Sequence, residues 1–375
     1  MKRKTTYFAV LLLVFIMIAG YSRQYIHKSS KLKIILFNEN SEKLELEIKE
    51  FAKINKIKVE IEKKDFYEVM EIMESKNILD QENTDIYMSV NDWTGEIVEK
   101  GLAEKIEDRE LEKAIPIVKE SLKVGGNYYG YPYRLETVFL YTNKKYIEKP
   151  PKDVEELLLL KREIEKKEKK EGLVFPTDEI YYHYPWYKYF GGSVNGLMEL
   201  NKEDLAMKNE IEFVGRNFKY MNSSVAIQKF KREESWMMIN GSWEIEHLED
   251  KYAIEYGMIR DESFKPFLGI KSFVINKKSK NKKLSKKLLK YILDDKSQNF
   301  LSKDKWHITP NKNIFKLGIN KATRELTWCI DTPEIMPSNA KIRYNCNRAG
   351  ELFARVVKNR ESVEESIEEL FGGEK

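Results

Sequence analysis

The chain has 375 residues, of which 42% are hydrophobic and 34% are charged. A chain of this length is expected to form two domains or two lobes with separate cores. The formal net charge is +5, but residues 1–31 contain six Lys or Arg and no acidic residue, so the rest of the chain carries a charge of only −1. Because a nucleic-acid-binding protein keeps a basic face on its folded domain, we expect no nucleic-acid partner.

The first residues have the pattern of an export signal. Lys2, Arg3 and Lys4 precede an apolar run over residues 7–20, which is the order found in signal peptides. This run is shorter than the roughly 20 residues that span a bilayer, so a cleaved signal and a retained anchor both remain open. Tyr21 follows where a bacterial lipoprotein would have Cys, so lipidation is not expected. We predict that residues 1–31 are an export signal or signal anchor plus linker, and that the protein is extracytoplasmic, either secreted or tethered to the outer face of the membrane.

The residues after this segment predict a largely parallel α/β sheet. Short apolar or alternating runs predict strands at residues 33–38, 57–62 and 84–90. The stretches 42–55 and 69–73 between them carry apolar residues at helical spacing. Strands that alternate with helices are typical of parallel sheets.

The later residues predict mostly helices with one further strand. We expect a mainly helical region over residues 151–248, a strand over 265–277, a helix around 284–292 and helices again after residue 331. Ligands bind at the carboxyl ends of strands in open α/β sheets. The third predicted strand leads directly into residues 91–93, Asn-Asp-Trp.

Aromatic residues are concentrated in the middle of the chain. Seven of the ten residues at positions 181–190 are Tyr, Trp or Phe, against 12% in the whole chain. A buried strand would favour Val, Ile and Leu, which bring no hydroxyl that needs a partner. So many Tyr next to Asp178 and Glu179 predict rings that meet something polar.

Motifs for nucleotide or metal binding do not occur. The sequence has no Walker loop, no GxGxxG and no CxxC, and only four His. We therefore expect no cofactor and no metal. Cys329 and Cys346 either form one disulfide or are two unrelated thiols.

Six stretches carry a family resemblance. They are IYMSVNDWTGEIVEKGLAEKI, GYPYRLETVFLYTNKKYIEKPPKDVEEL, LVFPTDEIYYHYPW, SWMMINGSWEI, KPFLGIKSFVINKKSKNKKLSKKLLKYIL and EIMPSNAKIRY. In this order and at these intervals they resemble the maltose- and maltodextrin-binding proteins, which belong to the extracellular solute-binding proteins of ABC importers. The resemblance runs from about Lys33 to the C-terminus.

This resemblance implies an α/β, two-lobed periplasmic-binding-protein-like fold with hinge crossings and a ligand cleft between the lobes. The N-terminal lobe would contain residues 33–134 and 270–315, and the C-terminal lobe residues 135–269 and 316–375. Residues 132–137 and 267–270 would be two of the hinge crossings.

The resemblance also implies a set of sugar contacts. Asp92, Glu136 and Glu179 would accept hydrogen bonds from sugar hydroxyls, and Tyr181 and Trp243 would stack on the apolar faces of a pyranose. Each has an alternative that remains open: Asp92 could cap a helix, Glu136 could form a salt bridge at the hinge, and Tyr181 and Trp243 could be packing residues.

Two further candidates and two departures complete the predicted site. Trp93 stands where the family often has a charged residue and could stack on ligand, and Asn40 ends the first strand. Ser89 and Cys346 occupy positions where the family commonly has a stacking Trp. The candidates to replace those rings are Trp93 and three residues of the aromatic run, Tyr182, Tyr184 and Trp186, although Trp186, Tyr189 and Phe190 are also candidates for packing a helix start. Otherwise the cleft holds a different sugar or a non-sugar solute.

The expected function is capture of a carbohydrate, an oligosaccharide such as a maltodextrin, and its delivery to an ABC permease in the membrane. The protein would act as a monomer and would not be an enzyme. One alternative is an orphan receptor that reports another solute to a membrane sensor. A second alternative is a glycoside hydrolase with Glu136 and Glu179 as its two carboxyl groups.

Overall fold

The computed structural model describes residues 31–74 and 84–372. The predicted export segment lies outside the described residues, except for Lys31, which begins the first strand. Within the described residues, no helix is both long enough and apolar enough to cross a membrane.

The first part of the chain alternates strands and helices as expected. Its main elements are β1 (Lys31–Phe37), α2 (Glu42–Asn55), β2 (Lys58–Lys64), α3 (Phe66–Glu74), β3 (Ile86–Val90), α5 (Thr94–Glu99), α6 (Pro116–Glu120), β4 (Lys123–Val124), β5 (Asn127–Tyr128), β6 (Tyr131–Glu136) and β7 (Val138–Asn143). Helix α2 buries Leu44, Ile48 and Phe51, which recur at helical spacing. It ends at Asn55, and the next residue, Lys56, caps it with a left-handed φ of 52°.

The remaining chain is largely helical. It contains α7 (Val154–Glu168), α8 (Ile180–Tyr189), α9 (Val194–Met198), α10 (Leu205–Asn217), α11 (Ser223–Lys231), β8 (Met237–Gly241), α12 (Ile245–Leu248), β9 (Ile254–Gly257), β10 (Phe267–Ile275), α13 (Lys282–Leu293), α14 (Asp295–Leu301), α15 (Lys312–Phe315), α16 (Lys321–Leu326), β11 (Glu334–Ile335), α17 (Ala340–Phe353) and α18 (Val363–Phe371).

The main sheet is mixed, not largely parallel. Its order is β11-β10-β3-β1-β2, and β6 also pairs with β10. Strands β1, β2 and β3 are parallel, as predicted, but β10 is antiparallel to β3 and to β6. The prediction was wrong for this part because β10 follows β3 by more than 170 residues, and no local pattern reveals the direction in which so distant a strand enters the sheet.

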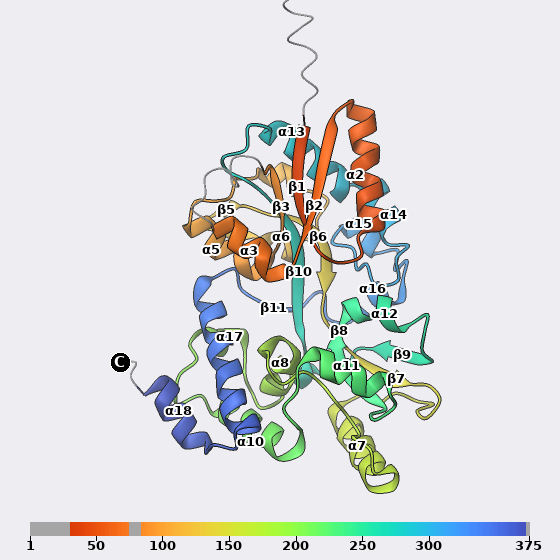
Figure 1. Cartoon of the computed structure of the whole chain (residues 1–375), viewed down its shortest axis with the longest axis vertical. Helices are drawn as coiled ribbons and strands as arrows, with labels where there is room; N and C mark the ends of the chain where they lie inside the picture. The colour runs from red at the N-terminus through yellow and green to blue at the C-terminus, as the bar shows by residue number, and fades with distance from the viewer. Residues whose placement is uncertain (1–30, 75–83, 373–375) are drawn as a thin grey trace, which may run out of the picture.

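A second sheet, of order β8-β7-β9, lies in the other half of the molecule. In Figure 1 the main sheet and helices α2, α13 and α14 occupy the upper half, and β7 to β9 with α7, α8, α10 and α11 occupy the lower half. Strand β10 runs from one half into the other, which gives a two-lobed α/β architecture.

Three clusters of buried side chains form the core. One is built around β1, β3 and α13, and another around α7, α8, α10 and α17. The third joins Leu135, Leu268 and Ile270 to Phe139 and Tyr141 of the second sheet, so it crosses the predicted lobe boundary. The proposed hinge segments 132–137 and 267–270 run side by side, since Glu136 pairs with Gly269 and Leu135 with Ile270.

The cysteines do not form a disulfide. Both are free thiols, Cys329 buried and Cys346 half-buried. The structure therefore favours the second of the two alternatives left open by the sequence.

Candidate functional site

A cavity of about 980 Å³ lies between segments of both halves. Its size is at the upper end of the roughly 300–1,000 Å³ typical of small-molecule sites. It is bordered by all the residues that the sequence predicted as ligand contacts: Asn40, Asp92, Trp93, Glu136, Glu179, Tyr181 and Trp243. The fold thus brings these residues to one place, and their contact with a ligand stays a prediction.

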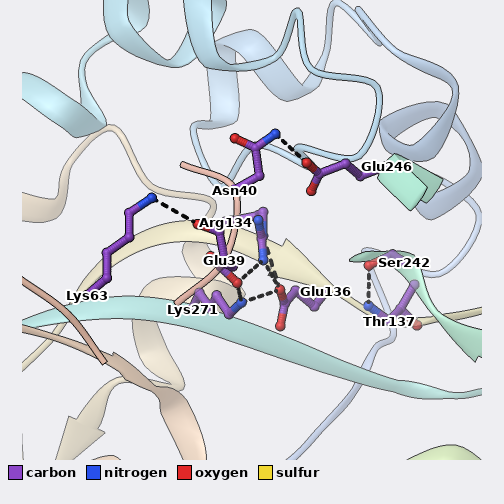
Figure 2. Close-up of polar contacts among 9 residues, drawn as sticks. All are labelled: Glu39, Asn40, Lys63, Arg134, Glu136, Thr137, Ser242, Glu246 and Lys271. Carbon is purple, nitrogen blue, oxygen red and sulfur yellow. Dashed lines mark hydrogen bonds and ion pairs between the residues drawn. The ribbon is translucent and has the colours of Figure 1, made fainter. Parts of the chain in front are cut away.

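A buried cluster of four charged residues forms one wall of the cavity (Figure 2). Arg134 Nε donates to Glu136 Oε1 over 3.1 Å, and Lys271 Nζ lies 3.1 Å from the same oxygen. Arg134 Nη2 lies 3.3 Å from Glu39 Oε2, which is also paired with Lys271. Arg134 is 1% exposed, and Glu136 and Lys271 are each 7% exposed. The Glu39 side chain is 22% exposed, so two cations balance two carboxylates in a largely buried cluster, as buried charges require.

This cluster ties three segments together. Glu39 follows β1, Arg134 and Glu136 are in β6, and Lys271 is in β10. Burial opposes ionisation of Glu39, but the charges of Arg134 and Lys271 outweigh it and hold the pKa of Glu39 below its usual value. The hinge salt bridge considered as an alternative for Glu136 is thus present in the structure.

Two other carboxyl groups of the cavity, Asp92 and Glu179, are less compensated than Glu39. Burial raises the pKa of Asp92 to about 6, opposed only by its own backbone amide and by Arg343. The pKa of Glu179 is also raised. Partial shielding of the carboxyl group from water is the larger cause, although the residue is exposed, and the negative charge of Asp178 adds to it. Neither 3-10 helix Asn91–Trp93 nor α5 has a side-chain cap, so Asp92 does not take the capping role that was its alternative.

Tyr181 and Trp243 form an aromatic wall. Their ring centroids are 5.9 Å apart, and Tyr182 meets Trp243 edge-on at 6.1 Å. Two glycines make room for them: a Cβ at Gly241 would lie 2.2 Å from the Trp243 ring, and one at Gly269 would lie 2.8 Å from the Tyr181 hydroxyl. Both rings are half-buried and also pack against the core. They therefore border the cavity, as predicted, and also have the packing role that was the alternative.

Trp93 does not offer an open face. It is 2% exposed, and its ring packs against Phe66 at 4.5 Å and Phe37 at 5.8 Å. Little of the ring is therefore open to a ligand, although Trp93 borders the cavity, and its stacking on a ligand stays a prediction. Phe66 and Tyr67, at the start of α3, also border the cavity.

Two polar contacts join the predicted lobes, each through at least one residue that borders the cavity. Asn40 Nδ2 donates to Glu246 in α12 (Figure 2). Arg343 Nη1 in α17 lies 2.9 Å from Glu96 in α5. Each joins a residue of the predicted N-terminal lobe to one of the predicted C-terminal lobe.

The sequence profile of the bacterial extracellular solute-binding proteins matches residues 48–323. The chain belongs to this family. It is similar to the maltotriose-binding protein of Pyrococcus abyssi (strain GE5 / Orsay), with 31% identity over 102 residues that make up 26% of this chain and 22% of that protein. It is also similar to the maltodextrin-binding protein MdxE of Bacillus subtilis (strain 168), with 24% identity over 271 residues, 65% of this chain and 64% of that protein. The chain thus spans less than two thirds of each of these relatives.

Membership of an extracellular solute-binding family implies an extracytoplasmic location and a role in solute binding. Within the described part of this solute-binding protein, no group of His, Cys, Asp and Glu side chains is arranged to hold a metal ion.

Sequence reasoning missed several residues of the cavity in this solute-binding protein: Glu39, Phe66, Tyr67, Arg134, Lys271, Trp306 and Arg343. Some had a usable signal. Arg134 and Glu136 are two residues apart in a strand, so their side chains share a face. Phe66 and Tyr67 follow the carboxyl end of β2, where α/β sheets bind ligands. Lys271 and Arg343 had no such signal.

The aromatic run of this solute-binding protein forms α8 up to Tyr189, and Phe190 follows the helix. Tyr181 and Tyr182 border the cavity, whereas Tyr184 and Trp186 are 0% exposed. Tyr184 donates to Glu334 Oε2 at 2.9 Å, and Trp186 packs against Phe264 at 4.6 Å. Tyr184 and Trp186 therefore do not replace the missing rings, and the packing role expected for Trp186 is confirmed.

Proposed function

We propose that this solute-binding protein captures an oligosaccharide, such as a maltodextrin, and delivers it to the permease of an ABC transporter. The observation that carries the proposal is one cavity in which the rings of Tyr181 and Trp243 lie with the carboxyl groups of Asp92 and Glu179. Rings match the apolar faces of a sugar, and carboxylates accept hydrogen bonds from its hydroxyls. The names of the maltotriose- and maltodextrin-binding relatives support the same ligand class.

The proposed mechanism is closure of two lobes over the ligand. Residues 33–134 and 270–315 would form one lobe, residues 135–269 and 316–375 the other, with hinges at 132–137 and 267–270. A ligand that contacts both lobes would stabilise the closed form, because only the closed form offers it both sets of contacts.

The direct test is isothermal titration calorimetry against saccharides of increasing length, together with mass spectrometry of any small molecule that copurifies. We expect a micromolar ligand, which corresponds to about −8 kcal/mol. Binding of a polyamine, a phosphate ester or a metal chelate with no heat from any saccharide would exclude the carbohydrate assignment.

The raised pKa of Asp92 predicts pH-dependent binding. A sugar hydroxyl donates to the ionised carboxylate, so binding favours the deprotonated form, and affinity should be constant above pH 7. Affinity should then fall by up to tenfold per pH unit as the pH drops below about 6, the pKa of Asp92. Calorimetry between pH 8 and pH 5 measures this.

Asp92→Asn is the matched control. It keeps the side-chain shape but removes the titration, so its affinity should be lower at pH 8 and should change less between pH 8 and pH 5. Glu179 and Asp178, whose pKa values are also raised, account for the dependence that remains. An equal pH dependence in Asp92→Asn and in the wild type would contradict the role of Asp92.

We further propose that the protein acts as a monomer outside the cytoplasm, secreted or tethered by an uncleaved residue 1–31 segment. The intact mass of the native protein decides between the two. A mass that begins near Tyr21 means secretion, and a complete N-terminus means tethering.

A further inference from the structure

Tyr67 is an exposed ring on the wall of the cavity. It is 64% exposed, and its neighbour Phe66 is 37% exposed. Both border the cavity at the start of α3. Large rings at a cavity wall that are not covered by the protein offer apolar area to a ligand.

The position of Tyr67 is fixed from behind. Its ring meets Phe66 edge-on, with centroids 5.2 Å apart and an interplanar angle of 89°. Phe66 in turn packs against Trp93 at 4.5 Å and Phe37 at 5.0 Å. Because these ring contacts lead into the core, the Tyr67 side chain is already restricted. It therefore loses less side-chain entropy when a ligand stacks on it.

Tyr67 borders the same cavity as three acidic residues, Asp92, Asp178 and Glu179. Although the ring is exposed, partial loss of water around it raises the pKa of Tyr67, and the charges of Glu179, Asp178 and Asp92 raise it further against the opposing charge of Arg343. A ligand held by Glu179 and Asp92 would therefore lie near the Tyr67 ring. Ser89 is fully buried and Trp93 is covered, so neither supplies a stacking surface on this side.

We propose that Tyr67, supported by Phe66, is the stacking surface of the N-terminal side of the cavity and favours saccharides long enough to reach it from Tyr181 and Trp243. This inference rests on the proposed function and adds a specificity-determining residue to it. Phe66 acts partly as a positioning residue, because it holds Tyr67 as well as bordering the cavity.

The test is calorimetry of Tyr67→Ala, Tyr67→Phe and Tyr344→Ala with glucose, maltose, maltotriose and longer maltodextrins, or with the saccharide series that the wild type binds. Tyr67→Ala should weaken binding of the longest bound saccharide roughly 5- to 20-fold, with a smaller effect on shorter ones. Tyr67→Phe should stay within about twofold of the wild type, because it keeps the ring. Tyr344→Ala is the matched control, since Tyr344 is 56% exposed but does not border the cavity, and it should bind like the wild type.

Three outcomes would overturn the inference. If Tyr67→Ala binds like the wild type, the ring makes no contribution, although the proposed function stands. If Tyr67→Phe loses as much affinity as Tyr67→Ala, the hydroxyl acts instead of the ring. If the wild type binds no saccharide, the proposed function and this inference both fail. Thermal unfolding of each variant checks that the fold is intact. We expect it to be intact, because the substituted side chains are exposed.

Discussion

Replacing Arg134 with methionine is expected to lower the free energy of unfolding by roughly 3–5 kcal/mol, because removal of one member of a buried ion cluster leaves its partners uncompensated. Arg134 is 1% exposed and contacts both Glu39 and Glu136. It also lies over the Trp306 ring, at 4.3 Å from the centroid. Urea-induced unfolding followed by circular dichroism measures the change.

Arg109→Met is the matched control. Arg109 pairs with Glu107 at 2.6 Å but its side chain is 79% exposed, and such pairs contribute about 0–1 kcal/mol. A double variant that adds Glu39→Gln to Arg134→Met should recover part of the loss, since it removes a stranded charge. If Arg134→Met costs no more than Arg109→Met, the cluster is not a stabilising element.

The contribution of the ion cluster to the free energy of unfolding should depend on pH. Because the folded pKa of Glu39 is lowered from 4.5, its contribution is fully present above pH 4.5 and is lost as the pH falls through the folded pKa. Protonated Glu39 no longer needs a cation. The difference in stability between the wild type and Arg134→Met should therefore shrink on acidification.

The elements near the N-terminus could be predicted from sequence because their signals are local. Residues 42–55 form α2 over the predicted range, and the predicted strands at 33–38 and 84–90 overlap β1 and β3. The antiparallel entry of β10 could not be predicted in this way. Its direction depends on pairing with β3 and β6, which are distant in sequence.

In the candidate site, too, residues that lie in local sequence motifs could be predicted, whereas contacts between residues far apart in sequence could not. Residues in recognisable motifs, such as Asp92 and Trp243, lie at the cavity as expected. The contact between Lys271 and Glu39 joins residues 232 positions apart, and neither lies in a motif that specifies the other. The burial of Trp93 has a related origin, because its contact with Phe66 depends on how α3 packs and not on the residues next to Trp93 in sequence.

The aromatic residues of α8 serve two roles: some pack in the core and others border the cavity. Substitutions of Trp186 and Tyr181, five residues apart, should separate the two roles. Trp186→Ala is expected to lower the free energy of unfolding by roughly 3–5 kcal/mol, the range for truncating a buried aromatic residue. Trp186 is 0% exposed and packs against Phe264 and Phe213 at 4.6 and 5.2 Å. Folded Trp186→Ala should retain its ligand affinity within a few-fold, because the residue does not border the cavity.

Tyr181→Ala should affect ligand affinity more than stability, the reverse of Trp186→Ala. Tyr181 is half-buried and borders the cavity, so its loss should weaken saccharide binding by roughly tenfold with a smaller loss of stability than that of Trp186→Ala. Trp186→Phe is the control for the core position. The indole nitrogen of Trp186 has no hydrogen-bond partner in the described chain, so phenylalanine forfeits only packing area and should retain most of the stability. Equal effects of Trp186→Ala and Tyr181→Ala on both unfolding and calorimetric affinity would contradict this division, since a ring in the core and a ring at the cavity act on different equilibria.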